Sequence, residues 1–151
     1  LDQAVVVFSA SGRPVLGICL GMQLMLGKSY EYGEHYGLGI IAGEVVPIPS
    51  GREEGVKRKI PHIGWNTLRP SEDGQNWRGS CFDSIGLTPS CYFVHSFMVV
   101  PENPYHALAN VDYEGVSIVA AIQSNNVIGM QFHPERSGPT GLKILRQFLA
   151  Q

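Results

Sequence analysis

One cysteine lies in a sequence context that could make it a nucleophile. Cys19 is the centre of the pattern Gly17-x-Cys19-x-Gly21 and directly follows the apolar run 15–18. Nucleophiles often stand on a strained turn between a strand and a helix, where the flanking positions favour glycine. The helix after the turn would lower the thiol pKa, and the amide of Leu20 would face a developing oxyanion. A buried cysteine in a glycine-rich turn is the alternative interpretation.

A histidine and a carboxylate near the other end of the chain could complete this site. His133 follows a predicted strand over 127–132, and Pro134 after it cannot continue the strand. Active residues of parallel α/β sheets gather at the carboxyl ends of strands. Glu135 projects to the same side as His133 in extended backbone, so it could fix the imidazole tautomer. Because a nucleophilic cysteine needs such a base and orienting group, we predict a triad of Cys19, His133 and Glu135. A surface histidine beside an acid is the alternative.

The other four histidines are interpreted as structural or surface residues. His62 and His95 lie in apolar predicted strands, where packing is the default role, and His35 and His106 are typical of loops. No spacing of cysteines and histidines indicates zinc, and no glycine-rich phosphate-binding loop is recognisable.

Composition restricts the class of protein. The 151 residues fit one domain, over 1–151, and the 44% hydrophobic and 16% charged residues are typical of a globular chain. A formal net charge of -2 gives no reason to expect nucleic acid, and no apolar run reaches the roughly 20 residues that span a bilayer. Three cysteines argue against a disulfide framework and for a reducing, cytoplasmic location. Cys81 and Cys91 lack the glycine frame, so we interpret them as small buried hydrophobic residues.

The order of the helices and strands that must position the triad is typical of an α/β fold, with a mixed, mostly parallel sheet flanked by helices. The predicted strands are 15–18, 44–48, 60–68, 92–100, 106–112, 116–122 and 127–132. The predicted helices are an N-terminal one ending near 11–12, then 22–28 and 141–150. We expect a polar, charged loop at 50–59 and turns at 113–115 and 125–126. The first helix has an apolar face, of Leu1, Ala4, Val5 and Phe8, at the very start of the chain, so we expect a fragment of a longer protein.

Five segments resemble a known family. Residues 17–23 (GICLGMQ) resemble the nucleophile motif of class-I glutamine amidotransferases, and residues 131–135 (QFHPE) resemble their second triad motif. Residues 61–66, 92–97 and 136–142 resemble the glutaminase subunits of imidazole glycerol phosphate synthase, of histidine biosynthesis. The resemblance extends over nearly all of the chain. It implies a flavodoxin-like α/β fold.

The resemblance also implies a reaction. Cys19 would attack the side-chain amide of glutamine, His133 would protonate the leaving ammonia and then activate water, and Glu135 would orient His133. The amide of Leu20, the side chain of Gln23 and the His95-Ser96-Phe97 segment would hold the substrate. No metal or organic cofactor is implied.

A partner is implied as well. Trp65, Tyr92 and Arg136 match positions near a (β/α)₈ synthase subunit, which would form a heterodimer with this chain and receive its ammonia.

Two residues depart from the family pattern, since Phe97 replaces the usual tyrosine and Arg136 a frequent lysine. The resemblance implies that further residues precede Leu1, with the first strands and a loop that completes the oxyanion hole. We therefore expect the 151 residues alone to be poorly active.

Three other functions remain open on the sequence. The chain could be the glutaminase domain of another class-I amidotransferase, although 61–66 and 92–97 argue against this. It could be a related cysteine hydrolase that acts on γ-glutamyl peptides. It could also be a non-catalytic binding module that keeps the fold.

Overall fold

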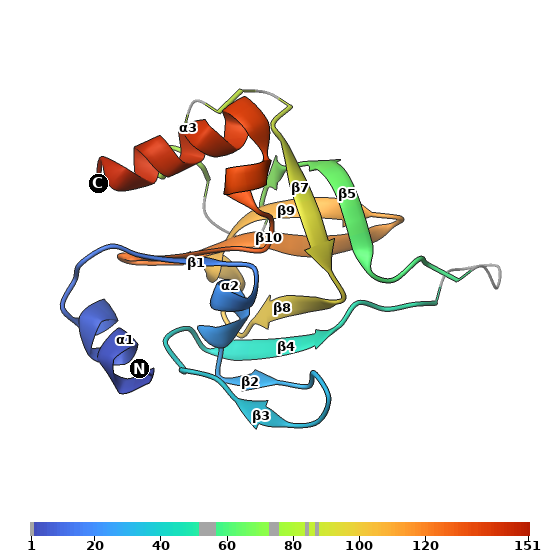
Figure 1. Ribbon diagram of the computed structural model, residues 1–151, viewed down its shortest axis with the longest axis horizontal. Coiled ribbons are helices and arrows are strands. Elements are labelled where there is room, and N and C mark those ends of the chain that lie inside the picture. The colour runs from blue at the N-terminus through green and yellow to red at the C-terminus, as the bar shows by residue number, and fades with distance from the viewer. Residues whose placement is uncertain (1, 52–56, 73–75, 84, 87) are drawn as a thin grey trace.

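The computed structural model describes residues 2–51, 57–72, 76–83, 85, 86 and 88–151 (Figure 1). The helices in this part of the chain are α1 (Asp2–Ala10), α2 (Leu20–Leu24) and α3 (Gly138–Leu149), with the 3-10 helices η2 (Pro104–His106) and η3 (Pro134–Arg136). The strands are β1 (Val15–Ile18), β2 (Lys28–Ser29), β3 (His35–Tyr36), β4 (Gly43–Pro47), β5 (His62–Thr67), β6 (Arg69–Pro70), β7 (Ser90–His95), β8 (Phe97–Pro101), β9 (Ala107–Tyr113), β10 (Val116–Ser124) and β11 (Val127–Met130).

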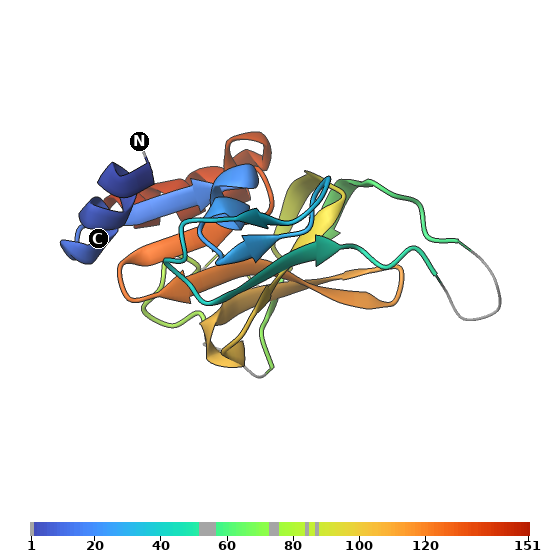
Figure 2. The ribbon, with the colours of Figure 1, turned by 90° about the horizontal axis from the view of Figure 1, so that it is seen from below.

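These strands form three sheets. The largest has the order β1-β11-β10-β9-β6, the second has the order β3-β2-β4-β8, and the third pairs β5 with β7. Figure 1 shows α3 on one side of the molecule and the β2–β3–β4 strands on the other, with α2 between them. Both views place the two chain ends at the left-hand end of the molecule (Figure 1 and Figure 2).

The expectation of an α/β fold with a mixed sheet and flanking helices is confirmed, but the sheet is not mostly parallel. Among the described residues only β1 with β11 and β2 with β4 run parallel. The short turns after β9 and β10 force the strands they join to run antiparallel, because a parallel neighbour needs a longer crossover. Glu114 and Asn125 occupy these turns with φ of 52° and 51°, so the predicted turns are confirmed.

The apolar core has two parts that meet at the large sheet. One surrounds three buried phenylalanines, Phe82, Phe93 and Phe132, and includes Ile144 of α3. The other packs Met22 of α2 and its neighbours against β4, β8 and β10. Cys19 is the residue directly before α2, and Met22 of α2 belongs to the second cluster, so burial of α2 fixes the position of Cys19.

Two predicted elements were wrong in extent. The helix expected over 22–28 is the shorter α2, because the chain must turn in time for Lys28 to pair with Glu44. The strand expected over 92–100 is two strands, β7 and β8, which belong to different sheets and are separated at Ser96. α1 forms as predicted, but Ser9 is its buried residue and most of its apolar face is exposed.

Candidate active site

The turn at Cys19 has the strained geometry of a nucleophile elbow. Cys19 lies between β1 and α2 with φ 52° and ψ -108°, outside the regions that ordinary residues favour. A Cβ at Gly17 would lie 2.7 Å from the carbonyl carbon and oxygen of Gly21, so glycine is required there. The expectation that both flanking positions favour glycine is wrong for Gly21, because a Cβ at that position would meet nothing within 4 Å.

Parallel pairing of β1 with β11 places both halves of the predicted site side by side. Ile18 pairs with Met130, and the Cys19 amide donates a hydrogen bond to the Met130 carbonyl at 2.7 Å. The next residues of that chain segment, Gln131 and His133, therefore emerge beside the elbow. The His133 amide in turn bonds the carbonyl of Tyr92 in β7 at 2.9 Å, which fixes the segment after β11 against a third strand.

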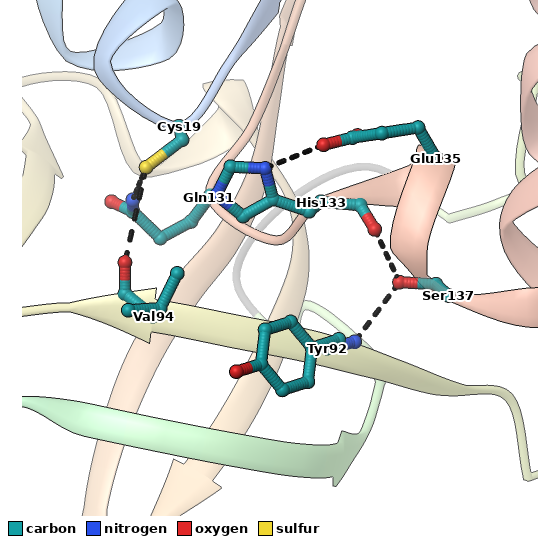
Figure 3. Close-up of polar contacts among 7 residues, drawn as sticks. All are labelled: Cys19, Tyr92, Val94, Gln131, His133, Glu135 and Ser137. Carbon is teal, nitrogen blue, oxygen red and sulfur yellow. Dashed lines mark hydrogen bonds and ion pairs between the residues drawn. The ribbon is translucent and has the colours of Figure 1, made fainter.

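Glu135 orients the imidazole of His133. Its Oε1 lies 2.7 Å from His133 Nδ1, and the His133 and Glu135 side chains are 22% and 50% exposed. Ser137 braces the same turn, since its hydroxyl donates to the His133 carbonyl at 2.6 Å and accepts from the Tyr92 amide at 2.9 Å. Figure 3 shows the imidazole lying between Cys19 and Glu135. In the described part of the chain no hydrogen bond joins Cys19 Sγ to His133, and catalytic contacts of this kind often tighten only with substrate bound.

The sulfur of Cys19 lies among polar groups at the edge of the core. The side-chain amide of Gln131 donates to Cys19 Sγ at 3.7 Å, and Sγ lies 4.0 Å from the carbonyl of Val94 (Figure 3). Burial raises the pKa of the Cys19 thiol, while hydrogen bonds from the Leu20 amide and from Gln131 oppose this rise.

The prediction of a lowered thiol pKa is therefore wrong for this structure. Helix α2 has five residues, so its dipole is small, and desolvation of the thiolate outweighs the amide donors. A thiol with a raised pKa is protonated at neutral pH. It can attack a carbonyl carbon only if a nearby base removes the proton, and His133 is the histidine beside it.

Two of the residues expected to hold the substrate turn inward. Gln23 is 9% exposed, and its Nε2 donates to Gln131 Oε1 at 3.0 Å and to the Phe97 carbonyl at 3.3 Å. His95 Nδ1 lies 2.8 Å from the same carbonyl. Both side chains thus fix the main chain of 95–97. Leu20 is 57% exposed, and Ser96 and Phe97 are partly buried.

His95 also forms a buried pair with His62, which confirms that both are packed histidines. Antiparallel pairing of β5 with β7 places them opposite each other, with His62 Nδ1 2.9 Å from His95 Nε2. Because a carbonyl can only accept, His95 carries its proton on Nδ1 and accepts at Nε2 from His62. Burial lowers the pKa of each histidine to about 4, so the pair is neutral at neutral pH.

The three residues expected at a partner interface form one surface patch. Trp65 and Tyr92 are opposite each other in β5 and β7, with ring centroids 6.1 Å apart. The Arg136 guanidinium lies 4.7 Å from the centre of the Tyr92 ring. Trp65 is 58% exposed and its neighbour Ile63 55%, so the outer face of this two-stranded sheet is apolar and open. We call Ile63, Trp65, Tyr92 and Arg136 the aromatic patch.

Sequence reasoning did not single out three groups that the structure places at the site. These are the side chain of Gln131, the carbonyl of Val94 and the hydroxyl of Ser137. A polar residue directly after an apolar strand and directly before the histidine segment was a signal for Gln131. The Val94 carbonyl and Ser137 carry no such signal, because long-range packing of β7 brings them to the site.

Features outside the site were also predicted. Cys81 and Cys91 are fully buried free thiols whose pKa burial raises to about 12, which confirms their structural interpretation. No group of three or more metal-binding side chains occurs among the described residues. Within the same ranges, every helix is too short or too polar to cross a membrane.

Comparison with known proteins agrees with this geometry. Residues 3–151 match the family described as glutamine amidotransferase class-I. The chain is 54% identical over 142 residues to imidazole glycerol phosphate synthase subunit HisH 1 of Legionella pneumophila (strain Lens), covering 94% of this chain and 67% of that protein. It is 47% identical over 137 residues to subunit HisH of Aquifex aeolicus, covering 91% of this chain and 60% of that one.

Solved structures with the same fold are more distant in sequence. A glutamine amidotransferase from Thermotoga maritima superimposes with a TM-score of 0.59 at 16% identity, over 99% of this chain and 52% of that one. The glutaminase domain of Trypanosoma brucei CTPS, solved with bound acivicin, gives a TM-score of 0.58 at 16% identity, over 99% and 66%. The fold and a family match that extends almost from end to end show that this chain belongs to the class-I glutamine amidotransferases.

Proposed function

We propose that this chain is the glutaminase part of an imidazole glycerol phosphate synthase in histidine biosynthesis. The arrangement of Cys19, His133 and Glu135 at the adjoining ends of β1 and β11 carries the chemical part of the proposal. The 54% identity to a HisH subunit supports the pathway. The chain spans from three fifths to two thirds of the length of such relatives, so the activity of the whole protein is part of the proposal.

The first half-reaction would form a thioester. Cys19 Sγ attacks the carboxamide carbon of glutamine while its proton moves to Nε2 of His133. The Leu20 amide stabilises the negative charge on the former carbonyl oxygen, because it already faces the sulfur. His133 then returns the proton to the nitrogen, the C–N bond breaks, and ammonia leaves. Glu135 keeps Nδ1 of His133 protonated and stabilises the imidazolium.

The second half-reaction would release glutamate. His133 removes a proton from water, the hydroxide attacks the thioester carbon, and the C–S bond breaks with return of the proton to sulfur. Each step uses the same histidine, so the 2.7 Å contact with Glu135 serves both halves of the cycle.

The segment 95–97 would hold glutamine next to the sulfur. The Val94 carbonyl, 4.0 Å from Cys19 Sγ, places the start of this segment beside the reacting centre. Gln23 and His95 would support the segment through the Phe97 carbonyl, while Ser96 and Phe97 would contact the substrate. Phe97 cannot supply the hydroxyl of the tyrosine usual in the family, so its contact with glutamine would be apolar.

The aromatic patch would bind the (β/α)₈ synthase subunit. Large aromatic side chains and arginine are enriched at the centres of interfaces, and here they lie on an open sheet face joined to the site through Tyr92. The Tyr92 carbonyl accepts the His133 amide, so the patch lies one strand away from the base. Ammonia released beside Cys19 would pass to that subunit.

Glutamate release tests this function. The chain is mixed with a synthase subunit in the presence of its ribotide ligand, and glutamate is measured with Cys19→Ala as the control. The assay is repeated on a version preceded by the N-terminal segment of the Legionella relative, because an extra segment could complete the oxyanion hole. We expect ligand-stimulated release that disappears in Cys19→Ala.

Two results would contradict parts of the proposal. Release that no synthase subunit stimulates, but that γ-glutamyl peptides also support, would point to a free-standing hydrolase. No release from either version would contradict the glutaminase function and favour a binding module.

A further inference from the structure

A buried carboxamide lies directly behind the sulfur of the proposed nucleophile. Gln131 has no exposed surface, yet it is polar and follows the last residue of β11. Its Nε2 lies 3.7 Å from Cys19 Sγ and its Oε1 3.0 Å from Gln23 Nε2. Burying a side-chain amide is costly unless its oxygen and its NH₂ are hydrogen-bonded, and in Gln131 both groups have a partner.

The direction of the Gln131 amide is set by its neighbours. The Phe97 carbonyl can only accept hydrogen bonds, so the Gln23 group that faces it must be the NH₂. That same NH₂ faces the Gln131 side chain, which must therefore present its oxygen there. The remaining Gln131 group, the NH₂, then points to the sulfur. A flipped Gln131 would bring two NH₂ groups together and leave the sulfur without this donor.

The Phe97 carbonyl is itself held in place. His95 Nδ1 donates to it at 2.8 Å, and His62 fixes the other nitrogen of that ring. The Phe97 carbonyl thus accepts hydrogen bonds from His95 and from Gln23. Gln23 in turn bonds Gln131, whose NH₂ contacts the sulfur.

We propose that Gln131 is a positioning residue that holds the Cys19 sulfur with its side-chain NH₂, and that Gln23 and the Phe97 carbonyl fix the direction of that donor. The proposal deepens the proposed function, since it assumes that Cys19 is the nucleophile. An amide NH₂ keeps its proton at all working pH values, so it donates to the thiolate without taking part in proton transfer. It favours the thiolate that forms when His133 accepts the proton, and it keeps Sγ in one place.

The thiol titration of Cys19 tests this role directly. The pH dependence of Cys19 alkylation by iodoacetamide is measured peptide by peptide with mass spectrometry, in the wild-type chain and in Gln131→Met. Methionine keeps the length and the burial of glutamine but has no donor. We expect the apparent pKa of Cys19 to rise by about one unit, which is roughly a tenfold smaller thiolate fraction at neutral pH.

The chain contains its own controls. Cys81 and Cys91 are fully buried, so they report unfolding in the same sample if they become labelled. Gln147→Met is the matched variant, because Gln147 Nε2 also bonds a carbonyl, that of Asp83, but belongs to α3. A loss of packing alone would affect stability in both variants, whereas the Cys19 titration should move only in Gln131→Met.

Gln23→Met is the second variant. It leaves Gln131 in place but removes the group that fixes its direction, so we expect a smaller rise of the Cys19 pKa. An unchanged Cys19 titration in Gln131→Met, with Cys81 and Cys91 still protected, would overturn the proposal. If Gln131→Met exposes Cys81 and Cys91, Gln23→Met decides, and an unchanged titration there would overturn it.

This result is independent of glutamate release. A shifted titration in a chain that releases no glutamate, even when the N-terminal segment of the Legionella relative is added, would support the role of Gln131 and contradict the proposed function. Normal hydrolysis of glutamine with an unshifted Cys19 titration would support the proposed function and contradict the role of Gln131.

Discussion

The turn at Cys19 predicts opposite effects for two glycine substitutions only four residues apart. Gly17→Ala places a methyl group 2.7 Å from the backbone carbonyl of Gly21 and 2.7 Å from Cε of Met25. The Met25 side chain can move, but the backbone contact can be relieved only by shifting the start of α2 away from β1. Gly21→Ala places the same methyl group in open space, within helix α2.

The magnitudes follow from the two environments. Overpacking of this kind costs about 1–3 kcal/mol, so Gly17→Ala should lower Tm by roughly 2–12 °C in a domain of this size. Gly21→Ala has no contact to relieve and reduces the freedom of the unfolded chain. It should leave stability unchanged or raise it by up to about 1 kcal/mol.

Thermal unfolding followed by circular dichroism measures both variants. Each carries one added methyl group in the same motif, so the pair controls for side-chain chemistry. Equal Tm values for Gly17→Ala and wild type, or an equal loss in Gly21→Ala, would refute the close packing of α2 against β1.

Three further predictions follow from other parts of the structure. Burial in the fold lowers the pKa of His95 from 6.5 to about 4, so the folded protein favours the neutral imidazole. The contribution of His95 to the free energy of unfolding is therefore complete above pH 6.5. It is lost as the pH falls toward 4, by up to about 3 kcal/mol. Urea unfolding at several pH values should show a smaller acid loss in His95→Gln than in wild type, while the exposed His35→Gln keeps it in full; equal losses in all three would contradict this interpretation. The buried Arg58 guanidinium donates to the carbonyls of Pro49, Gly51, Tyr113 and Glu114, which lie on two separate segments of the chain, so Arg58→Ala should cost about 2–4 kcal/mol in urea unfolding. The exposed Arg78→Ala should cost almost nothing, and equal costs would argue against this role of Arg58. Glu135→Gln should reduce kcat for glutamate release by roughly 10²–10⁴ with little change in Tm, because the imidazole loses the partner that fixes its tautomer; an unchanged kcat would remove Glu135 from the mechanism.

Much of the local structure could be predicted because local patterns determine it. The run 15–18 is β1 as expected, and the turns at Glu114 and Asn125 adopt the positive φ that their hairpins require. The helix predicted over 141–150 corresponds to α3, which begins three residues earlier, ends at Leu149 and buries Ile144 in the core.

What could not be predicted depends on contacts between distant segments. The strand expected over 92–100 breaks at Ser96 because β7 pairs with β5 and β8 with β4, and no residue near Ser96 shows which partner a strand will choose. The two-residue strands β2, β3 and β6 are too short to carry a period. The charged loop expected over 50–59 lies partly outside the described residues.

The candidate site also combines features that local sequence predicts with features that depend on contacts between distant segments. The residue types and their order predicted Cys19, His133 and Glu135, and the pairing of β1 with β11 brings their segments together. The thiol pKa was predicted in the wrong direction, because sequence shows the helix after Cys19 but not how deeply the sulfur is buried.

The most direct test of the central claim is covalent trapping of the nucleophile. The chain is treated at neutral pH with a chloroketone analogue of glutamine, with and without excess glutamine, and the modified peptides are identified by mass spectrometry. We predict modification of Cys19 that glutamine suppresses and that His133→Asn slows strongly, with Cys81 and Cys91 unmodified. Modification that glutamine does not suppress, or that reaches all three cysteines alike, would contradict a glutamine-hydrolysing site at Cys19.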